Sequence, residues 1–110
     1  MIKNNKIRIN SDLGEGTGVE KDIMPFLSSC SIACGGHTGD KSTMTDTILI
    51  AKKYGVNIGA HPSYPDKENF GRKNISISNA DLTNSLINQI DDLDRIARSL
   101  ETSLEHIKLH

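Results

Sequence analysis

Four short runs along the chain have the hydrophobic pattern of β-strands. Residues 6–10 (KIRIN) alternate β-branched and polar positions, whereas residues 30–34 (CSIAC) and 56–60 (VNIGA) are continuous small or apolar runs. Residues 106–109 (HIKL) begin a fourth run. Continuous runs of this length are typical of strands that are buried on both faces of a parallel sheet.

Between these runs, apolar residues recur at helical spacing. Residues 22–27 have room for one or two helical turns, and Asp40 is a candidate N-cap of a helix that runs to Tyr54 and ends at Gly55. Residues 78–81 have the form of a capping box and predict the start of a longer helix. The apolar stripe of this helix consists of Leu82, Leu86, Ile90, Leu93, Ala97, Leu100 and Leu104. A coiled-coil seam is the alternative, but the flanking strands favour a globular domain.

The alternation of strands and helices predicts an α/β fold with parallel strands and right-handed crossovers. One long irregular stretch, residues 61–76, contains two of the three prolines. Irregular stretches of this length in a compact domain usually carry function or are disordered.

Polar side chains come directly after each predicted strand in the chain. In order along the chain they are Asp12 and Glu15; His37 and Asp40; His61, Ser63, Tyr64 and Asp66; and Lys108 and His110. Because the carboxyl ends of parallel strands lie at one edge of a sheet, we expect these groups to converge there. Gly35 and Gly36 would let the backbone turn tightly, so that His37 faces the shared pocket. His106 falls at the opposite end of its strand and is expected at the surface.

Several of these residues also have simpler explanations. Asp12 could be only a turn or cap residue, and the capping role of Asp40 does not exclude a role in a site. Asp12, His37, His61 and His110 are also residue types that bind divalent metals, but their spacing is too wide to be diagnostic, so no metal ligand is assigned. Residues 14–18 (GEGTG) are only a weak match to a phosphate loop because the GK[ST] ending is missing.

Composition and charge narrow the classes of function. The formal net charge is -1, with acidic and basic residues scattered along the chain, so neither nucleic acid nor an anionic membrane is an expected partner. Cys30 and Cys34 would lie roughly 13 Å apart on one strand, which is too far for a disulfide. We expect two small buried residues in a reducing cytoplasm.

Four segments together resemble a known family. INSDLGEG, IMPFLSSCSIACGGHTGD, GVNIGAHPSYPDKENFGRK and HIKLH are similar, in order and spacing, to the LamB/YcsF family, the family of the 5-oxoprolinase A subunit. The resemblance implies a (β/α) barrel of the glycoside hydrolase/deacetylase type. It also implies ATP-dependent opening of 5-oxo-L-proline to L-glutamate with partner subunits B and C.

The resemblance also suggests roles for the residues at the strand ends. It implies a catalytic set of Asp12, His37, His61 and Lys108, and a substrate-binding set of Glu15, Asp40, Arg72 and His110. Two positions depart from the family pattern beside this site: Ser11 stands where the family usually has Cys, and Gly36 where it has an aromatic residue.

The length of the chain matches only part of such a barrel. A full barrel uses roughly 250 residues, so residues 1–110 correspond to a single domain, the N-terminal half of the barrel. The chain is then either a fragment, a truncated product or a remnant that assembles differently. Half a barrel is expected to expose an apolar inner face, which predicts a homodimer with aliphatic contacts that buries well over roughly 1,600 Å².

Two other functions stay open beside lactam opening. One is a metal-dependent hydrolase of the deacetylase type, in which a bound cation activates water. The other is a half-domain that binds partner subunits without catalysis.

Overall fold

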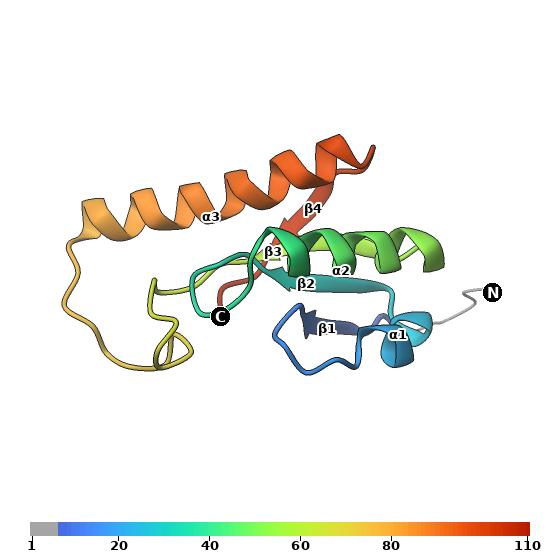
Figure 1. Ribbon diagram of the computed structural model, residues 1–110, viewed down its shortest axis with the longest axis horizontal. Helices are drawn as coiled ribbons and strands as arrows, with labels where there is room; N and C mark the ends of the chain where they lie inside the picture. The colour runs from blue at the N-terminus through green and yellow to red at the C-terminus, as the bar shows by residue number, and fades with distance from the viewer. Residues whose placement is uncertain (1–6) are drawn as a thin grey trace.

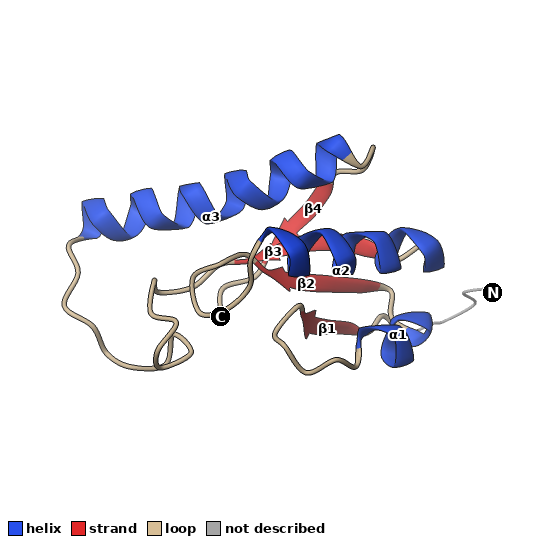
Figure 2. Ribbon diagram, viewed as in Figure 1, coloured by secondary structure: helices blue, strands red, loops and turns tan. Residues whose placement is uncertain are grey.

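Four parallel strands form one sheet in chain order in the computed structural model, which describes residues 7–110. The strands are β1 (Asn10–Leu13), β2 (Ser29–Ala33), β3 (Asn57–His61) and β4 (Leu104–Ile107). The helices in the connections are α1 (Glu20–Ile23), the 3₁₀ helix η1 (Met24–Phe26), α2 (Lys41–Tyr54) and α3 (Asn79–Ser99) (Figures 1 and 2). The predicted α/β fold with parallel strands is therefore confirmed.

Two strands lie elsewhere than the sequence pattern predicts. The strand predicted at 6–10 begins only at Asn10 (residue 6 lies outside the described residues), and it continues to Leu13 because Asn10 to Leu13 pair with β2. Asp12 therefore lies within the strand, not in the turn that follows it. The fourth strand begins at Leu104, which the pattern had assigned to the helical stripe, because α3 ends at Ser99.

The predicted ends of the two long helices are largely confirmed. The carboxylate of Asp40 accepts from Thr43 N at 2.9 Å, and the Thr43 hydroxyl accepts from Asp40 N at 2.9 Å, which completes a capping box. Gly55 ends α2 in the left-handed conformation. Ser78 caps α3 by accepting from Asp81 N at 3.1 Å.

The hydrophobic core lies between one face of the sheet and the helices. Both α2 and α3 contact β3, and they contact each other (Figure 1). The core includes Cys30, Ile32 and Ile58 from the sheet, with Ile48 from α2 and Leu93 and Ala97 from α3. The stripe of α3 therefore packs in a globular core, not in a coiled coil. Both cysteines are free thiols and buried, as predicted.

The other face of the sheet is polar, so the expectation of an apolar inner face is wrong. In β2, Ser29 and Ser31 alternate with the core residues Cys30 and Ile32, and in β3 Gly59 lies between the core residues Ile58 and Ala60. Ser31 Oγ lies 2.9 Å from His106 Nε2, Asn10 Nδ2 donates to Ser29 Oγ at 2.8 Å, and Lys108 pairs with Asp12. The aliphatic contacts assumed for a homodimer are therefore not available on this face.

His106 is half-buried, not a surface residue as the sequence suggested. Its imidazole lies over Gly59, where an added Cβ would overlap the ring. Its Nε2 also lies 3.4 Å from Asn10 Nδ2.

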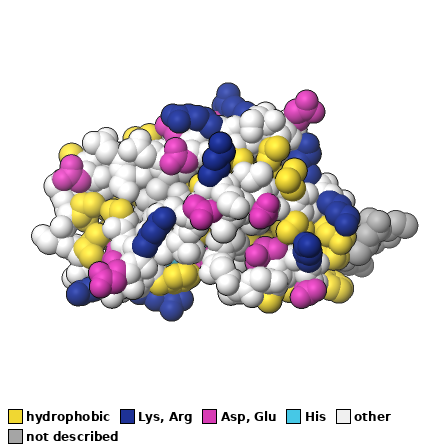
Figure 3. Space-filling model, viewed as in Figure 1, with side chains coloured by type: hydrophobic (Ala, Val, Ile, Leu, Met, Phe, Trp, Pro, Cys, Tyr) yellow, Lys and Arg dark blue, Asp and Glu magenta, His cyan; other side chains and the backbone are white. Residues whose placement is uncertain are grey.

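Charged residues of both signs are dispersed over the face of the molecule in Figure 3, without a large area of one sign. Within residues 7–110, no helix has the length and apolar character that crossing a membrane requires.

Candidate functional site

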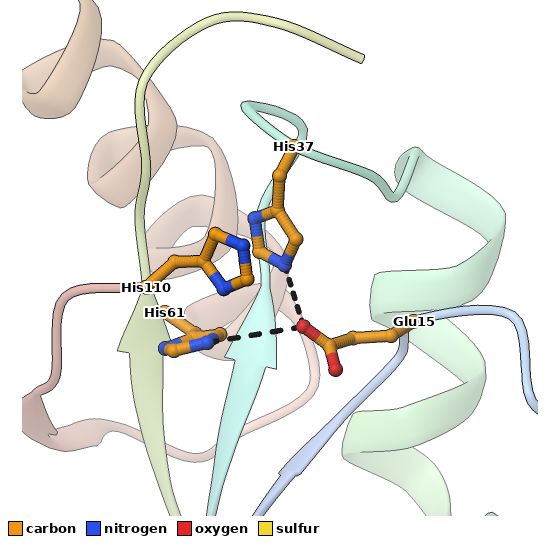
Figure 4. Close-up of side chains that lie close together, drawn as sticks. All are labelled: Glu15, His37, His61 and His110. Atoms are coloured by element: carbon orange, nitrogen blue, oxygen red, sulfur yellow. Dashed lines mark hydrogen bonds and ion pairs between the residues drawn. The ribbon is translucent and has the colours of Figure 1, made fainter. Parts of the chain in front are cut away.

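Three histidines and a glutamate converge at the carboxyl edge of the sheet. Glu15 lies in the turn after β1, His37 in the loop after β2, His61 at the end of β3, and His110 after β4 (Figure 4). One ligand atom from each of the four lies within 4.8 Å of the others. The predicted convergence of strand-end residues is thus confirmed for this set, which we call the histidine cluster.

Glycines set the backbone of the two loops that carry Glu15 and His37. Glu15 lies between Gly14 and Gly16, which both have positive φ. Gly35 has φ 102°, consistent with the predicted tight turn. Gly36 has another role, because a Cβ there would overlap Ser63 Oγ and Gln89 Oε1. Gly36 therefore permits a close approach of the 61–76 segment.

His37 makes a hydrogen bond through each ring nitrogen. Its Nδ1 lies 2.9 Å from Ser63 Oγ, and its Nε2 lies 2.6 Å from Glu15 Oε2. The ring also stacks on His110 with 3.9 Å between centroids. Burial lowers the pKa of His37, and the hydrogen bond with Glu15 opposes this change.

His61 is fully buried, but only one of its ring nitrogens has a partner. Its Nδ1 lies 2.7 Å from the carbonyl oxygen of Lys108. In the described part of the chain, Nε2 has no hydrogen-bond partner. Its neighbours are Glu15 Oε2 at 3.8 Å (Figure 4) and Asp12 Oδ2 at 3.4 Å. A buried nitrogen without a partner is unusual and marks a place where a ligand would fit.

The 61–76 segment folds back over the cluster and contacts His110. Phe70 and Gly71 both have positive φ, and the Phe70 carbonyl oxygen lies 2.9 Å from His110 Nε2. A Cβ at Gly71 would lie 2.8 Å from His37 Cβ, so the segment packs closely on the cluster. This arrangement supports the interpretation of the long irregular stretch as functional.

Asp12 and Lys108 join the first strand to the chain end that follows β4. Lys108 Nζ donates to both Asp12 oxygens, at 2.9 and 3.1 Å. The Asp12 side chain is 34% exposed and the Lys108 side chain is 52% exposed, so both remain accessible beside the buried His61.

Besides Asp12 and Lys108, two more predicted site residues, Asp40 and Arg72, lie outside the histidine cluster. The Asp40 carboxylate caps α2, and Asp40 lines a separate groove of about 910 Å³ between α2 and α3. Arg72 is exposed, and its guanidinium carbon lies 5.0 Å from the centre of the Phe70 ring. Arg72 therefore lies at the rim of the site, one aromatic ring away from His37 and His110.

Gln89 is a residue of the site that the sequence analysis missed. It is buried on α3, where its Oε1 accepts from Ser63 N at 3.0 Å and its Nε2 donates to the Ser63 carbonyl at 2.9 Å. These bonds fix Ser63, which in turn contacts His37. The available signal was an amide within the apolar stripe of the helix, between Leu86 and Leu93. Ser63 was noted only for its place after a strand, and Phe70 was not singled out.

Comparison with known proteins gives close matches over nearly the whole chain. It is 38% identical to the 5-oxoprolinase A subunit of Vibrio campbellii, over 99% of this chain and 45% of that protein. It is 42% identical to the 5-oxoprolinase A subunit of Campylobacter jejuni subsp. doylei, over 96% of this chain and 43% of that protein.

A solved structure agrees with these matches. The crystal structure of the Lactam Utilization Protein from Thermus thermophilus superimposes with a TM-score of 0.89 and 32% identity, covering 96% of this chain and 45% of that one. The chain thus spans just under half the length of the relatives it matches. The model of the LamB/YcsF family matches residues 7–110, and the chain belongs to the LamB/YcsF family.

Proposed function

We propose that this chain takes part in the ATP-dependent opening of 5-oxo-L-proline to L-glutamate, as a homologue of the 5-oxoprolinase A subunit that acts with subunits B and C. The observation that carries the proposal is the convergence of bases and cations at one sheet edge, in a chain 38–42% identical to proteins of that name. The likeness to 45% of a longer structure supports an N-terminal half of a (β/α) barrel, with residues 1–110 as one domain.

Opening a lactam requires three events at one amide. Water adds to the carbonyl carbon, the C–N bond breaks, and the nitrogen gains a proton while the carbon becomes the carboxylate of glutamate. ATP would supply activation of the poorly electrophilic amide carbonyl. The side chains of the site would have to move the protons and bind the charges of the substrate.

His61 and Asp12 are placed to act on the water. The Lys108 carbonyl can only accept, so it fixes the proton of His61 on Nδ1 and leaves a lone pair on Nε2. This Nε2 lies 3.4 Å from Asp12 Oδ2, so the two bases are side by side. Either group could take the proton when water attacks.

His37 and the cations at the rim supply the remaining functions. The hydrogen bond between His37 Nε2 and Glu15 is a path by which a proton could reach the leaving nitrogen. Lys108 and Arg72 are exposed cations on two sides of the histidine cluster, suited to the carboxylate of 5-oxoproline. His110 would form the wall between them.

The proposal is tested by glutamate production from 5-oxoproline. The chain is combined with ATP and subunits B and C of a related 5-oxoprolinase, and Asp12→Ala is compared with the unaltered chain. We expect turnover with the unaltered chain and a large loss in the variant. A folded chain that associates with the subunits but produces no glutamate would instead favour a half-domain without catalysis.

A homodimer and a cytoplasmic location belong to the same proposal. Ile107 and Leu109 are 58% and 64% exposed beside the β4 edge, and this edge, not the polar face, would be the contact between copies. Sedimentation that shows a monomer at micromolar concentration would contradict the dimer.

A metal-dependent hydrolase is the second candidate function, and the histidine cluster favours it. In that case hydrolysis would need neither ATP nor partner subunits, so turnover by the isolated chain would distinguish it from the first.

A further inference from the structure

We infer that Glu15, His37, His61 and His110 form a binding site for one divalent transition-metal ion, with zinc preferred. Three nitrogen ligands and a carboxylate oxygen lie within 4.8 Å of one another at the end of the sheet. With the ion bound, His61 Nε2 is a ligand, and Asp12 alone is left to take the proton from water. Any part that the ion plays in the reaction rests on the proposed function, whereas the binding of the ion does not.

The first argument is the orientation of two of the rings. Metal-binding histidines usually donate their second N–H to a carbonyl or carboxylate, which leaves the other nitrogen free for the metal. His61 Nδ1 lies 2.7 Å from the Lys108 carbonyl, and His110 Nε2 lies 2.9 Å from the Phe70 carbonyl. Since a carbonyl only accepts, both ring nitrogens must carry the proton. His61 Nε2 and His110 Nδ1 are then lone pairs in the neutral rings.

The third ring has the same arrangement. Ser63 Oγ donates to the Tyr64 carbonyl at 3.1 Å and therefore accepts from His37 Nδ1–H. In the neutral ring, Nε2 then carries the lone pair and points at Glu15 Oε2, 2.6 Å away. Without an ion, a proton on Nε2 makes the hydrogen bond across this distance. A metal ion would displace that proton and bind all four residues, once the two atoms separate to the spacing of ligands around one ion.

The second, independent argument is the unpartnered nitrogen of His61. This side chain is fully buried, and its Nε2 has no hydrogen-bond partner among residues 7–110. Burying a polar atom without a partner is costly, and structures rarely contain one unless it serves a purpose. Coordination of an ion would satisfy this nitrogen.

The donor set indicates the kind of ion. Neutral imidazoles with one carboxylate suit zinc, whereas magnesium and calcium prefer oxygen ligands. Ligand atoms around a tetrahedral zinc lie about 3.4 Å apart, so modest side-chain shifts would close the present cluster on an ion. Glu15 is 17% exposed and His110 is exposed, so the site also has a route for entry from solvent.

Metal content can be measured on the full chain without any activity assay. The protein is purified without a polyhistidine tag, stripped with a chelator and titrated with zinc, and bound metal per chain is determined by mass spectrometry. Cobalt is used as a second probe, because its visible absorption reports coordination by nitrogen ligands. We expect one zinc per chain and a tetrahedral or five-coordinate cobalt spectrum.

Four variants locate the site. His61→Ala and Glu15→Gln should weaken zinc binding by more than about 100-fold. Ser63→Ala removes no ligand but loses the hydroxyl that bonds His37 and the Tyr64 carbonyl, and should weaken binding by about 10–100-fold. His106→Ala is the matched control, because it removes the one histidine of the chain outside the cluster, and it should bind as the unaltered chain does. If His61→Ala does not fold, Glu15→Gln serves, since it keeps the size of the side chain.

The outcomes separate this inference from the proposed function. Absence of stoichiometric zinc at micromolar concentration, or equal binding by Glu15→Gln and the unaltered chain, would overturn the inference. Binding that depends on His106 as much as on His61 would also overturn it. Stoichiometric zinc with no glutamate production would uphold the ion site and contradict lactam opening.

Discussion

The polar face of the sheet and its carboxyl edge each hold histidine, but the two environments differ in one respect. On the polar face, His106 Nε2 lies 2.9 Å from Ser31 Oγ, and Ser31 also donates to Asn10 Oδ1 at 3.1 Å. At the carboxyl end, His61 Nε2 is buried without a partner among the residues that the structure describes. The polar-face network makes its hydrogen bonds within the protein, whereas the carboxyl-edge cluster leaves His61 Nε2 without one. Residue type alone therefore does not mark a site; unsatisfied polar atoms do.

The largest expected effect is on turnover. His61→Ala should lower glutamate production with ATP and subunits B and C by about 10²–10⁴-fold, the range for loss of a general base. His106→Ala should leave turnover near the unaltered level while lowering stability, because it opens the network on the polar face. Initial rates and urea unfolding of both variants check this. Equal losses of turnover in the two variants would show that the histidine cluster and the His106 network do not differ in their role in turnover.

Two glycines allow a matched test of packing. Gly36→Ala would push into Ser63 and Gln89 at the carboxyl edge, and Gly59→Ala into the His106 ring on the polar face. Each should lower the free energy of unfolding by about 1–3 kcal/mol. Only Gly36→Ala should also weaken zinc binding, because it displaces the hydroxyl that orients His37. Zinc binding unchanged in Gly36→Ala would argue that Ser63 does not position the ring.

The two cysteines test whether the core is packed equally tightly along β2. Burial raises the pKa of Cys30 and of Cys34 from 9.0 to about 12. In the unfolded chain the thiols lose protons near pH 9, whereas in the folded chain they keep them, so this contribution to stability is complete below pH 9 and is lost as the pH rises toward 12. Each thiol should lower the free energy of unfolding by about 1.4 kcal/mol per pH unit in that window.

Urea unfolding between about pH 8 and pH 11 measures this slope. Cys30→Ala and Cys34→Ala should each remove a similar part of it. A slope that depends on one cysteine alone would show that the core is tighter at one end of β2 than at the other.

The smallest expected effect is on stability at Lys108. Its pair with Asp12 is half exposed, so Lys108→Gln should change the free energy of unfolding by less than about 1 kcal/mol. The comparable surface pair Arg98–Asp94, at 2.9 Å on α3, offers Arg98→Gln as a control with a similar small effect. Only Lys108→Gln should reduce turnover. A turnover loss in both variants would point to a general effect on folding.

Much of the fold could be predicted from the sequence because local chemistry determines it. Asp40 and Ser78 cap the start of a helix and Gly55 the end of one, each through bonds to residues near it in the chain, and these caps were predicted correctly. Strand bounds depend on pairing with distant residues, so the bounds of β1 and β4 were predicted wrongly. The polar face was missed because the apolar strand pattern was assigned to both faces.

The site shows the same division. The rule that parallel strands end at one edge was enough to bring Glu15, His37 and His61 together. It could not place Asp40 in its separate groove, or foresee that Gln89 reaches Ser63 from a helix, because those contacts depend on how α3 packs over the loop.

The pairing of the first strand with the chain end beyond β4 has a consequence for the order of folding. Asp12 and Lys108 are 96 residues apart in the chain, yet their side chains touch. Closing so long a loop costs entropy before any contact offsets it, so such contacts tend to form late. Helix α2 and its neighbouring strands can assemble early, whereas the histidine cluster exists only after β4 has docked. Recovery of ligand binding during refolding should therefore lag behind recovery of helical structure.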